Sequence, residues 1–299
     1  MVSIVKTPDL DKKRTELKKE QRRLTIRKFL QNKLAVTGSV ILVLLVLLAV
    51  VGPMLISSDP YAINPEDRLQ GPSADYILGT DNFGRDLLSR IIYGAQISLL
   101  IGLSVSFFAG VFGTIIGLYA SYYRPLDNIL MRICEGIMAI PAILLAIALM
   151  AALGPSTKNI ILALSVVYTP YVARVVRSSA LVVREETYIE AMKAIGAKSS
   201  RIIWGHMAPN VMSPLIIQIT SVFANAILIE ATLSFLGAGV PAPTPSWGNI
   251  LYDGKLVIFN TPWMVVFPGI CIVLAILALN MFGDGLRDIL DPHSNKGKK

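Results

Sequence analysis

Long stretches without a charged side chain are the feature that most limits how this chain can fold. A helix needs about 20 apolar residues to cross a hydrocarbon layer of about 30 Å. Residues 34–58, 95–123, 136–157 and 256–283 each reach that length with no Asp, Glu, Lys or Arg. Because 54% of the 299 residues are hydrophobic and only 16% are charged, we expect a multi-span membrane protein.

Two further segments are expected to complete a bundle of six transmembrane helices. Residues 202–229 are uncharged but begin with polar and helix-breaking residues, so this span is expected to start near Val211. Residues 159–173 are short for a span unless Arg174 and Arg177 extend the helix to the membrane surface with their long side chains. The predicted fold class is an all-α membrane protein.

The distribution of positive charge predicts the orientation of the bundle. Most of the 28 Lys and Arg residues fall on the cytoplasmic side if the N-terminus is cytoplasmic, and both termini are then cytoplasmic. The expected order is a basic cytoplasmic tail, a first transmembrane helix, an extracytoplasmic loop, a five-helix core and a cytoplasmic tail, at residues 1–33, 34–56, 57–94, 95–285 and 286–299.

The net charge of +8 comes mainly from the basic tail, which precedes the first expected span. Membrane lipids with anionic headgroups are the nearer partner for such a tail, and no nucleic acid is expected to bind. The apolar run after the tail is too long for the core of a signal peptide and lacks an obvious small-residue cleavage site. The first span is therefore expected to remain in the mature protein.

Residue types that carry metal or cofactor chemistry are sparse. No Gly-Lys pair is followed by Ser or Thr, as a phosphate-binding loop would require, so this chain is expected to bind no cofactor and to leave ATP and Mg to another protein. Cys134, Cys271, His206 and His293 do not occur at metal-ligand spacings, so no metal site is expected.

Charged residues inside the expected spans are also few. Glu230 lies clearly within a hydrophobic run. Because a carboxylate inside a membrane span costs free energy, its presence there indicates a function. It either lines the outer part of a translocation path, near a cationic group of the solute, or makes a structural hydrogen bond to a neighbouring helix. Four other charged residues fall near expected span ends: Glu135, Arg174, Asp127 and Asp284. The spans therefore contain few charged groups for ion coupling and no facing Asp pair for an intramembrane hydrolase. No catalytic residue is expected.

Residues 186–210 form a helix-prone, partly charged segment between two expected spans. A helix, a turn and a second helix are expected here, with Gly196 ending the first helix in the left-handed conformation. Ser199 or Ser200 is expected to cap the second helix, which runs to Met207.

Another protein could bury the apolar surface of this segment. That surface is expected to come from Ile195, Ile202, Ile203 and Trp204. By spacing alone, an ordinary solvated connection is an equally good interpretation.

Glu190, Ala191, Gly196 and Pro209 match the Glu-Ala-Ala, Gly and Pro pattern of one known loop. Through them the segment resembles the EAA loop of ATP-binding-cassette (ABC) importer permeases. Met192 stands where the pattern has its second Ala. The difference is tolerable because this position mainly requires a residue that favours a helix.

Three further stretches resemble the C-type membrane subunit of the dipeptide and oligopeptide permease family. They are "LGTDNFGRDLLSRIIYGAQISLLIG" at 78–102, "HMAPN" at 206–210 and "LSFLGAGVPAPTPSWG" at 233–248. With the matching order of spans, the resemblance covers nearly the whole chain after the basic tail. It implies the type I ABC importer permease fold.

The resemblance also implies partners and a location. The partners are a second, homologous permease subunit, two cytoplasmic ATP-binding subunits and an extracytoplasmic solute-binding protein, and the location is a bacterial or archaeal inner membrane. The EAA loop would then be the coupling region that an ATPase subunit binds. Its residues would be Glu190, Ala191, Gly196, Arg201 and Pro209.

A motif in the first outer loop has local chemistry of its own. Asp81 to Gly84 are expected to form an Asx turn, and the helix that follows places Asp86 and Arg90 one turn apart as a candidate ion pair. The motif residues are Gly79, Asp81, Gly84, Arg85 and Asp86.

The resemblance implies a permease subunit of an ATP-driven importer of dipeptides or oligopeptides, with no enzymatic activity of its own. A member of the same family that carries glutathione, nickel or oligosaccharides is the first alternative. An ion-driven secondary transporter is the alternative from another class.

Overall fold

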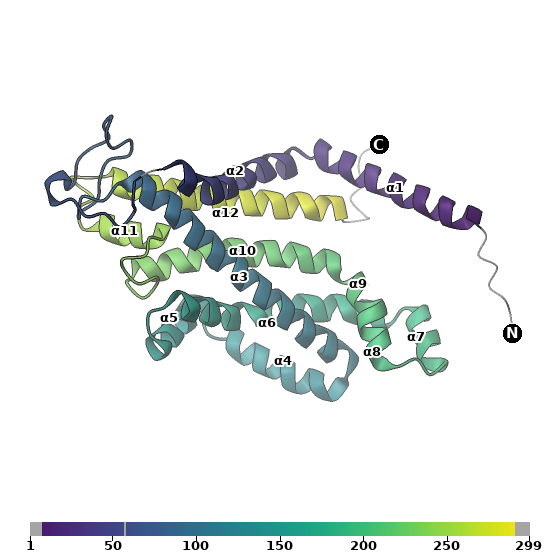
Figure 1. The fold of residues 1–299 in the computed structure, drawn as a ribbon. Helices are drawn as coiled ribbons and strands as arrows, with labels where there is room; N and C mark the ends of the chain where they lie inside the picture. The colour runs from purple at the N-terminus through teal and green to yellow at the C-terminus, as the bar shows by residue number, and fades with distance from the viewer. Residues whose placement is uncertain (1–7, 57, 291–299) are drawn as a thin grey trace.

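The computed structural model describes residues 8–56 and 58–290, which are mostly helical (Figure 1). Among these residues, five helices are long and apolar enough to cross a membrane. They are α2 (Lys33–Leu55), α3 (Leu87–Tyr122), α6 (Thr157–Arg184), α10 (Met212–Phe235) and α12 (Trp263–Leu290). Helix α3 begins earlier than the expected start at residue 95, so the loop expected at 57–94 ends at Asp86.

The third expected span, at 136–157, is not one straight helix. It is a pair, α4 (Arg124–Met138) and α5 (Ala142–Leu153), bent by 91° at a short break. Pro141 lies at this break and has no N–H to continue the ladder, and it disfavours the helical conformation of the residue before it. If this bent pair is counted as one span, the described residues contain six spans.

The fourth expected span is longer than residues 159–173. Helix α6 continues to Arg184, so Arg174 and Arg177 lie well inside it. The Arg177 guanidinium is bonded to both carboxylate oxygens of Asp127 on α4, and the Nη2–Oδ2 distance is 2.6 Å. This ion pair fixes how α4 lies along α6.

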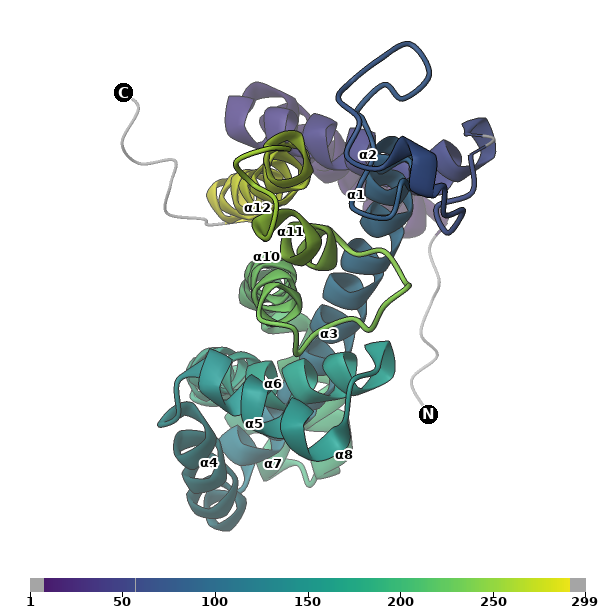
Figure 2. The same ribbon diagram turned by 90° about the vertical axis from the view of Figure 1, so that its left-hand side faces the viewer.

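Close packing of α3 on α6 forms the centre of the bundle. A Cβ atom at Gly113 would lie 2.5 Å from the Cβ of Val172, and one at Gly117 would lie 2.7 Å from the carbonyl oxygen of Ala173. Only glycine allows the two backbones to approach this closely. On the other side, α2 packs along α12 (Figure 2).

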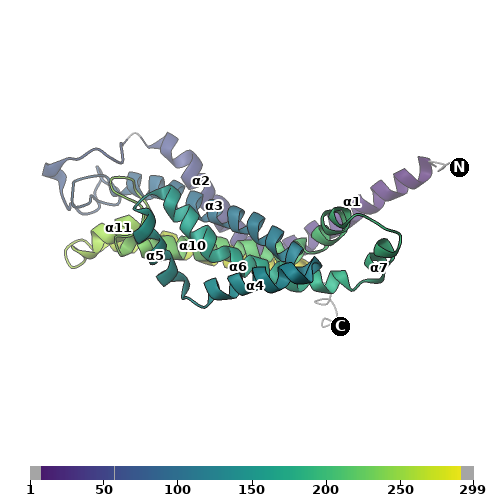
Figure 3. The same ribbon diagram turned by 90° about the horizontal axis from the view of Figure 1, so that it is seen from below.

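The remaining elements lie at the two ends of the bundle (Figures 1 and 3). At one end, which we call the hairpin end, lie α1 (Pro8–Gln31), α7 (Thr187–Ala194), α8 (Ser199–Ile202), a π-helical turn (Ile203–Met207), α9 (Ala208–Asn210) and the end of α12. At the opposite end, which we call the loop end, lie residues 58–86, with the 3-10 turn Pro65–Asp67, and α11 (Trp247–Lys255).

Candidate functional site

The turn between α7 and α8 has the geometry that the sequence predicts. Gly196 has a φ of +76°, in the left-handed region. Its N–H donates to the carbonyl of Lys193, and the N–H of Ala197 donates to the carbonyl of Met192, both at 3.0 Å. These two bonds form a Schellman motif, which closes the carboxyl end of α7.

The second helix of this segment differs from the expected one. Lys198 is its N-cap residue, and neither Ser199 nor Ser200 caps it, since α8 already begins at Ser199. The helix does not end before Pro209, because it continues through the π-helical turn into α9. Pro209 follows this π-helical turn, and local π adjustments of this kind accommodate a proline within a helix.

The five EAA-loop residues all lie on the surface of the hairpin end. Glu190, Ala191, Gly196, Arg201 and Pro209 are exposed.

Apolar side chains accompany them on this surface. Ile195 is 82% exposed and Trp204 is 45% exposed. Ile202 and Ile203, which were expected to share this surface, are instead buried against the bundle. The expectation was wrong for them because these two side chains attach the hairpin to its own subunit.

A hollow of about 680 Å³ opens between the turn and α8. The exposed ends of Ile195 and Trp204 lie at its wall together with the Arg201 side chain. A surface that combines a cation, exposed apolar side chains and a concave shape is typical of a protein interface. The hollow is lined by Ile195, Gly196, Ala197, Lys198, Ser200, Arg201, Trp204 and Gly205.

The motif of the first outer loop is brought together at the loop end. Asp81 is buried, and its Oδ1 accepts the backbone N–H of Phe83 at 2.8 Å and of Arg85 at 3.0 Å, which is the expected Asx turn. Gly79 and Gly84 both have positive φ. Carbonyl oxygens of the same loop would collide with a Cβ at either position, so both need to be glycine.

Arg90 does not pair with Asp86. Asp86 instead caps α3, because its carboxylate accepts the N–H groups of Leu88 and Ser89. The Arg90 guanidinium is buried 3.4 Å from Asp81 and 3.9 Å from Asp253. The expected pair is therefore wrong, since the cap keeps the Asp86 carboxylate at the helix terminus.

Asp253, on α11, completes this cluster and was missed by the sequence analysis. Its carboxylate lies 3.2 Å from Nη2 of Arg85. Burial raises the pKa of the Asp253 carboxyl, while the charges of Arg90 and Arg85 act in the opposite direction. We call Asp81, Arg85, Arg90 and Asp253 the loop-end cluster.

Glu230 is completely buried within α10. Its carboxylate accepts hydrogen bonds from Ser234 at 2.8 Å and from Ser98 of α3 at 3.1 Å. The two serine hydroxyls in turn accept the backbone N–H groups of Val240, in the loop between α10 and α11, and of Trp247, the first residue of α11. In this conformation Glu230 reaches no surface, which favours the structural hydrogen bond over a position in the path.

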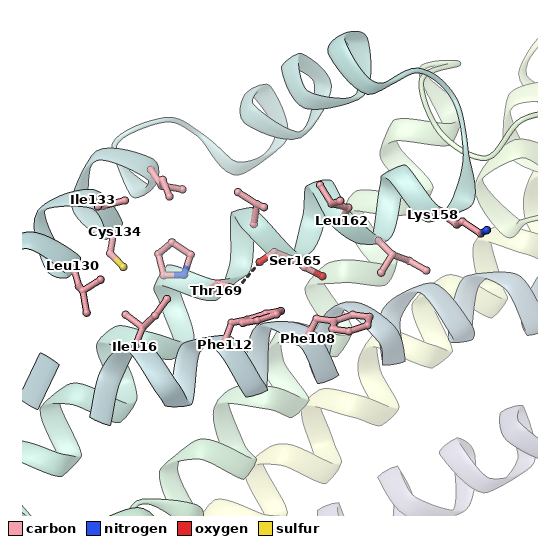
Figure 4. Close-up of a pocket in the computed structure, with 14 residues that line it drawn as sticks. Phe108, Phe112, Ile116, Leu130, Ile133, Cys134, Lys158, Leu162, Ser165 and Thr169 are labelled. Atoms are coloured by element: carbon pink, nitrogen blue, oxygen red, sulfur yellow. Dashed lines mark hydrogen bonds between the residues drawn. The ribbon is translucent and has the colours of Figure 1, made fainter. Parts of the chain in front are cut away.

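An apolar groove of about 650 Å³ runs between α3, α4 and α6 (Figure 4). Ile133 and Cys134 point into it from α4, and Phe108 and Phe112 border it from α3. Lys158 lies at its rim near the loop end.

The arrangement of spans, hairpin and loops points to a class of protein. A bundle of apolar spans with an exposed helical hairpin at one end and loops held by buried charges at the other is the form of a membrane permease that another protein engages. The chain belongs to the family described as binding-protein-dependent transport system inner membrane component, which it matches over residues 109–296. Residues 20–72 match the N-terminal TM domain of oligopeptide transport permease C.

Named relatives agree with this family. The dipeptide transport system permease protein DppC of Alkalihalophilus pseudofirmus is 48% identical over 263 residues, which cover 88% of this chain and 86% of the relative. The di/tripeptide transport system permease protein DppC of Pseudomonas aeruginosa is 40% identical over 271 residues, covering 88% and 89%.

The MetNI methionine ABC transporter, solved in inward-facing conformations, shares the fold. Its TM-score is 0.57 at 20% identity, and the match covers 68% of this chain and 97% of that chain. The fold is thus that of an ABC importer permease. This chain is a multi-pass inner-membrane transport permease, and it works with other components of an ABC importer.

Proposed function

We infer that this chain forms half of the translocation path of an ATP-driven importer of dipeptides or oligopeptides. The observation that carries the substrate class is the 48% identity to a dipeptide permease over nearly the full length of both chains. The second half of the path comes from a homologous permease subunit. An extracytoplasmic solute-binding protein delivers the peptide.

The α7–α8 hairpin is the coupling element in this proposal. Two cytoplasmic ATP-binding subunits hold ATP and Mg. One of them binds the hairpin at the hollow that Trp204 and Arg201 line. Exposure of Ile195 supports this role, because an 82% exposed isoleucine on a short helix is stabilised when a partner buries it. The hairpin end is then cytoplasmic, as the positive charges predict.

Glu190 lies on α7 with its side chain exposed, on the surface that the ATPase subunit would cover. A carboxylate at such an interface can orient the loop through a charge-assisted hydrogen bond. Gly196 supplies the left-handed turn that sets the angle between the two short helices.

Uptake measurements in the cell that makes this protein test the substrate class. Removing the chain is expected to abolish uptake of a labelled dipeptide, and restoring it is expected to return that uptake. Glutathione, nickel and oligosaccharide uptake should not change. Loss of one of these with normal dipeptide uptake would assign the chain to the alternative substrate instead.

A further inference from the structure

Helix α4 has two chemically different faces. Leu130, Ile133 and Cys134 point toward the apolar groove (Figure 4). At 3.6 residues per turn, Arg132 and Glu135 lie together on another side of the helix. There the Arg132 side chain is 86% exposed and the Glu135 side chain 55% exposed, and their charged groups lie 3.6 Å apart.

Both residues lie at a depth where the neighbouring helices are still apolar. The Asp127–Arg177 pair sets the register of α4 along α6, and Glu135 lies about 12 Å further from the hairpin end at 1.5 Å per residue. At the level of Val172 on α6, helix α3 continues for about 13 Å from Gly113 to Tyr122 before it ends. By the Asp127–Arg177 register the Arg132–Glu135 pair lies opposite residues 169–172 of α6, about 18–22 Å from the first residue of that helix, which is inside a layer of about 30 Å that starts there.

Arg174, on α6, adds a second cation at this depth. It is exposed, and within residues 8–56 and 58–290 its guanidinium forms no ion pair, in contrast to Arg177. Arg174 lies one turn of α6 from Arg177, toward the loop end, and Glu135 lies two turns of α4 from Asp127 in the same direction, so both charges are on the same side of the Asp127–Arg177 pair along the bundle. We call Arg132, Glu135 and Arg174 the mid-membrane charges.

Exposed charges at this depth need water or a protein partner, because lipid would leave them unsolvated. Arginine can reach a headgroup by extending along its helix. Glu135 cannot, since its short side chain starts about 16 Å from the first residue of α4. A lipid-facing position is thus inconsistent with Glu135.

We propose that the mid-membrane charges line a water-filled path through the membrane and that Arg174 binds the carboxylate of a peptide as it passes. A guanidinium without an ion-pair partner matches a carboxylate with two parallel hydrogen bonds. Glu135, whose side chain is 55% exposed on α4, can face the peptide ammonium group. The peptide part of the proposal rests on the proposed function, whereas the water-filled face does not.

Water access is tested with the assembled transporter in membranes, after Cys134 and Cys271 are replaced by serine. The variant R132C is expected to react with a small hydrophilic thiol reagent at least about tenfold faster than I133C, its neighbour on the groove side at nearly the same depth. Equal rates would overturn the water-filled face. This result does not depend on which solute the transporter carries.

Carboxylate binding is tested by dipeptide uptake. Arg174→Gln is expected to lower the maximal uptake rate at least about fivefold, with unchanged apparent affinity and normal recovery of the ATPase subunits, and Arg174→Lys is expected to retain more of the rate. Lys158→Gln, which removes an exposed cation near the start of α6, is the control and should transport normally.

Normal uptake by Arg174→Gln would overturn the role of Arg174. Absence of dipeptide uptake in the unmodified transporter would overturn the proposed function, and the labelling contrast would still decide the water-filled face.

Discussion

Arg85 and Asp253 lie 3.2 Å apart at the loop end, although they are 168 positions apart in the chain. This contact joins the first outer loop to α11. Asp81 accepts from Arg85 at 2.6 Å on its other side, so two carboxylates and two guanidinium groups hold the loop on the bundle. The loop-end cluster therefore links two segments that are far apart in the sequence.

Removing a buried member of this cluster is expected to destabilise the outer loop. Asp81→Asn leaves Arg85 and Arg90 buried with one carboxylate fewer, which we expect to cost about 3 kcal/mol of unfolding free energy. Thermal unfolding of the purified protein measures the change. Asp75→Asn, at an exposed position in the same loop, is the control and should unfold like the unmodified chain. Equal stability of the two variants would show that the cluster does not fasten the loop.

The two serines that donate to Glu230 are each expected to protect one backbone amide between α10 and the start of α11 from hydrogen exchange. Ser98→Ala removes the acceptor of the Trp247 N–H, and Ser234→Ala removes the acceptor of the Val240 N–H. Hydrogen exchange should therefore speed up at Trp247 in the first variant and at Val240 in the second. In Glu230→Ala both amides should exchange faster, because both hydroxyls lose the carboxylate that orients them. Unchanged exchange in Glu230→Ala would refute this structural role.

The hairpin is expected to control coupling and not folding. Gly196→Val places a β-branched residue at a φ of +76°, which costs roughly 1–2 kcal/mol and alters the turn. Glu190→Leu removes an exposed carboxylate. Both variants should insert into the membrane, and dipeptide uptake should fall at least about tenfold, which corresponds to about 1.4 kcal/mol.

Gly154→Val is the matched control for the glycine variant. Gly154 also has a positive φ and open space around it, but it lies in the turn between α5 and α6, away from the hairpin. Its replacement should leave recovery of the ATPase subunits and the stimulation of ATP hydrolysis by loaded binding protein intact. If Gly196→Val and Glu190→Leu behaved like this control, the coupling role would be wrong.

Orientation is expected to follow the positive charges. A cysteine at Ser73, exposed in the first outer loop, should react with an impermeant thiol reagent added outside intact cells, and one at Ser200, exposed on the hairpin, should not. Serine at positions 134 and 271 removes the background signal. The reverse pattern would place the hairpin outside the cell and exclude its contact with cytoplasmic ATPases.

Spans and local turns were predictable because their causes lie within short windows of sequence. An uncharged run predicts a span through its length alone, and Gly196 predicts the end of α7 because few other residues adopt a positive φ. Proline was a poorer guide. Pro53, Pro170 and Pro268 lie inside continuous helices, whereas Pro141 lies at a 91° bend, so a proline in the sequence did not by itself predict a break.

Contacts between distant segments were not predictable. Asp86 and Arg90 have the right spacing for a pair, but the amides at the start of α3 compete for Asp86 and leave Arg90 to Asp81 and Asp253. Likewise, the sequence predicted Arg174 near a span end, whereas α6 continues to Arg184 and Arg174 lies well within that helix.

Peptide uptake into vesicles tests the central claim most directly. The vesicles contain this chain, its partner permease and the ATPase subunits, with loaded binding protein on one side and ATP on the other. We predict that labelled dipeptide accumulates only when ATP and the ATPases are present, and that a proton or sodium gradient across vesicles without the ATPases drives no uptake. Uptake driven by such a gradient through this chain alone would contradict the account and identify an ion-driven transporter.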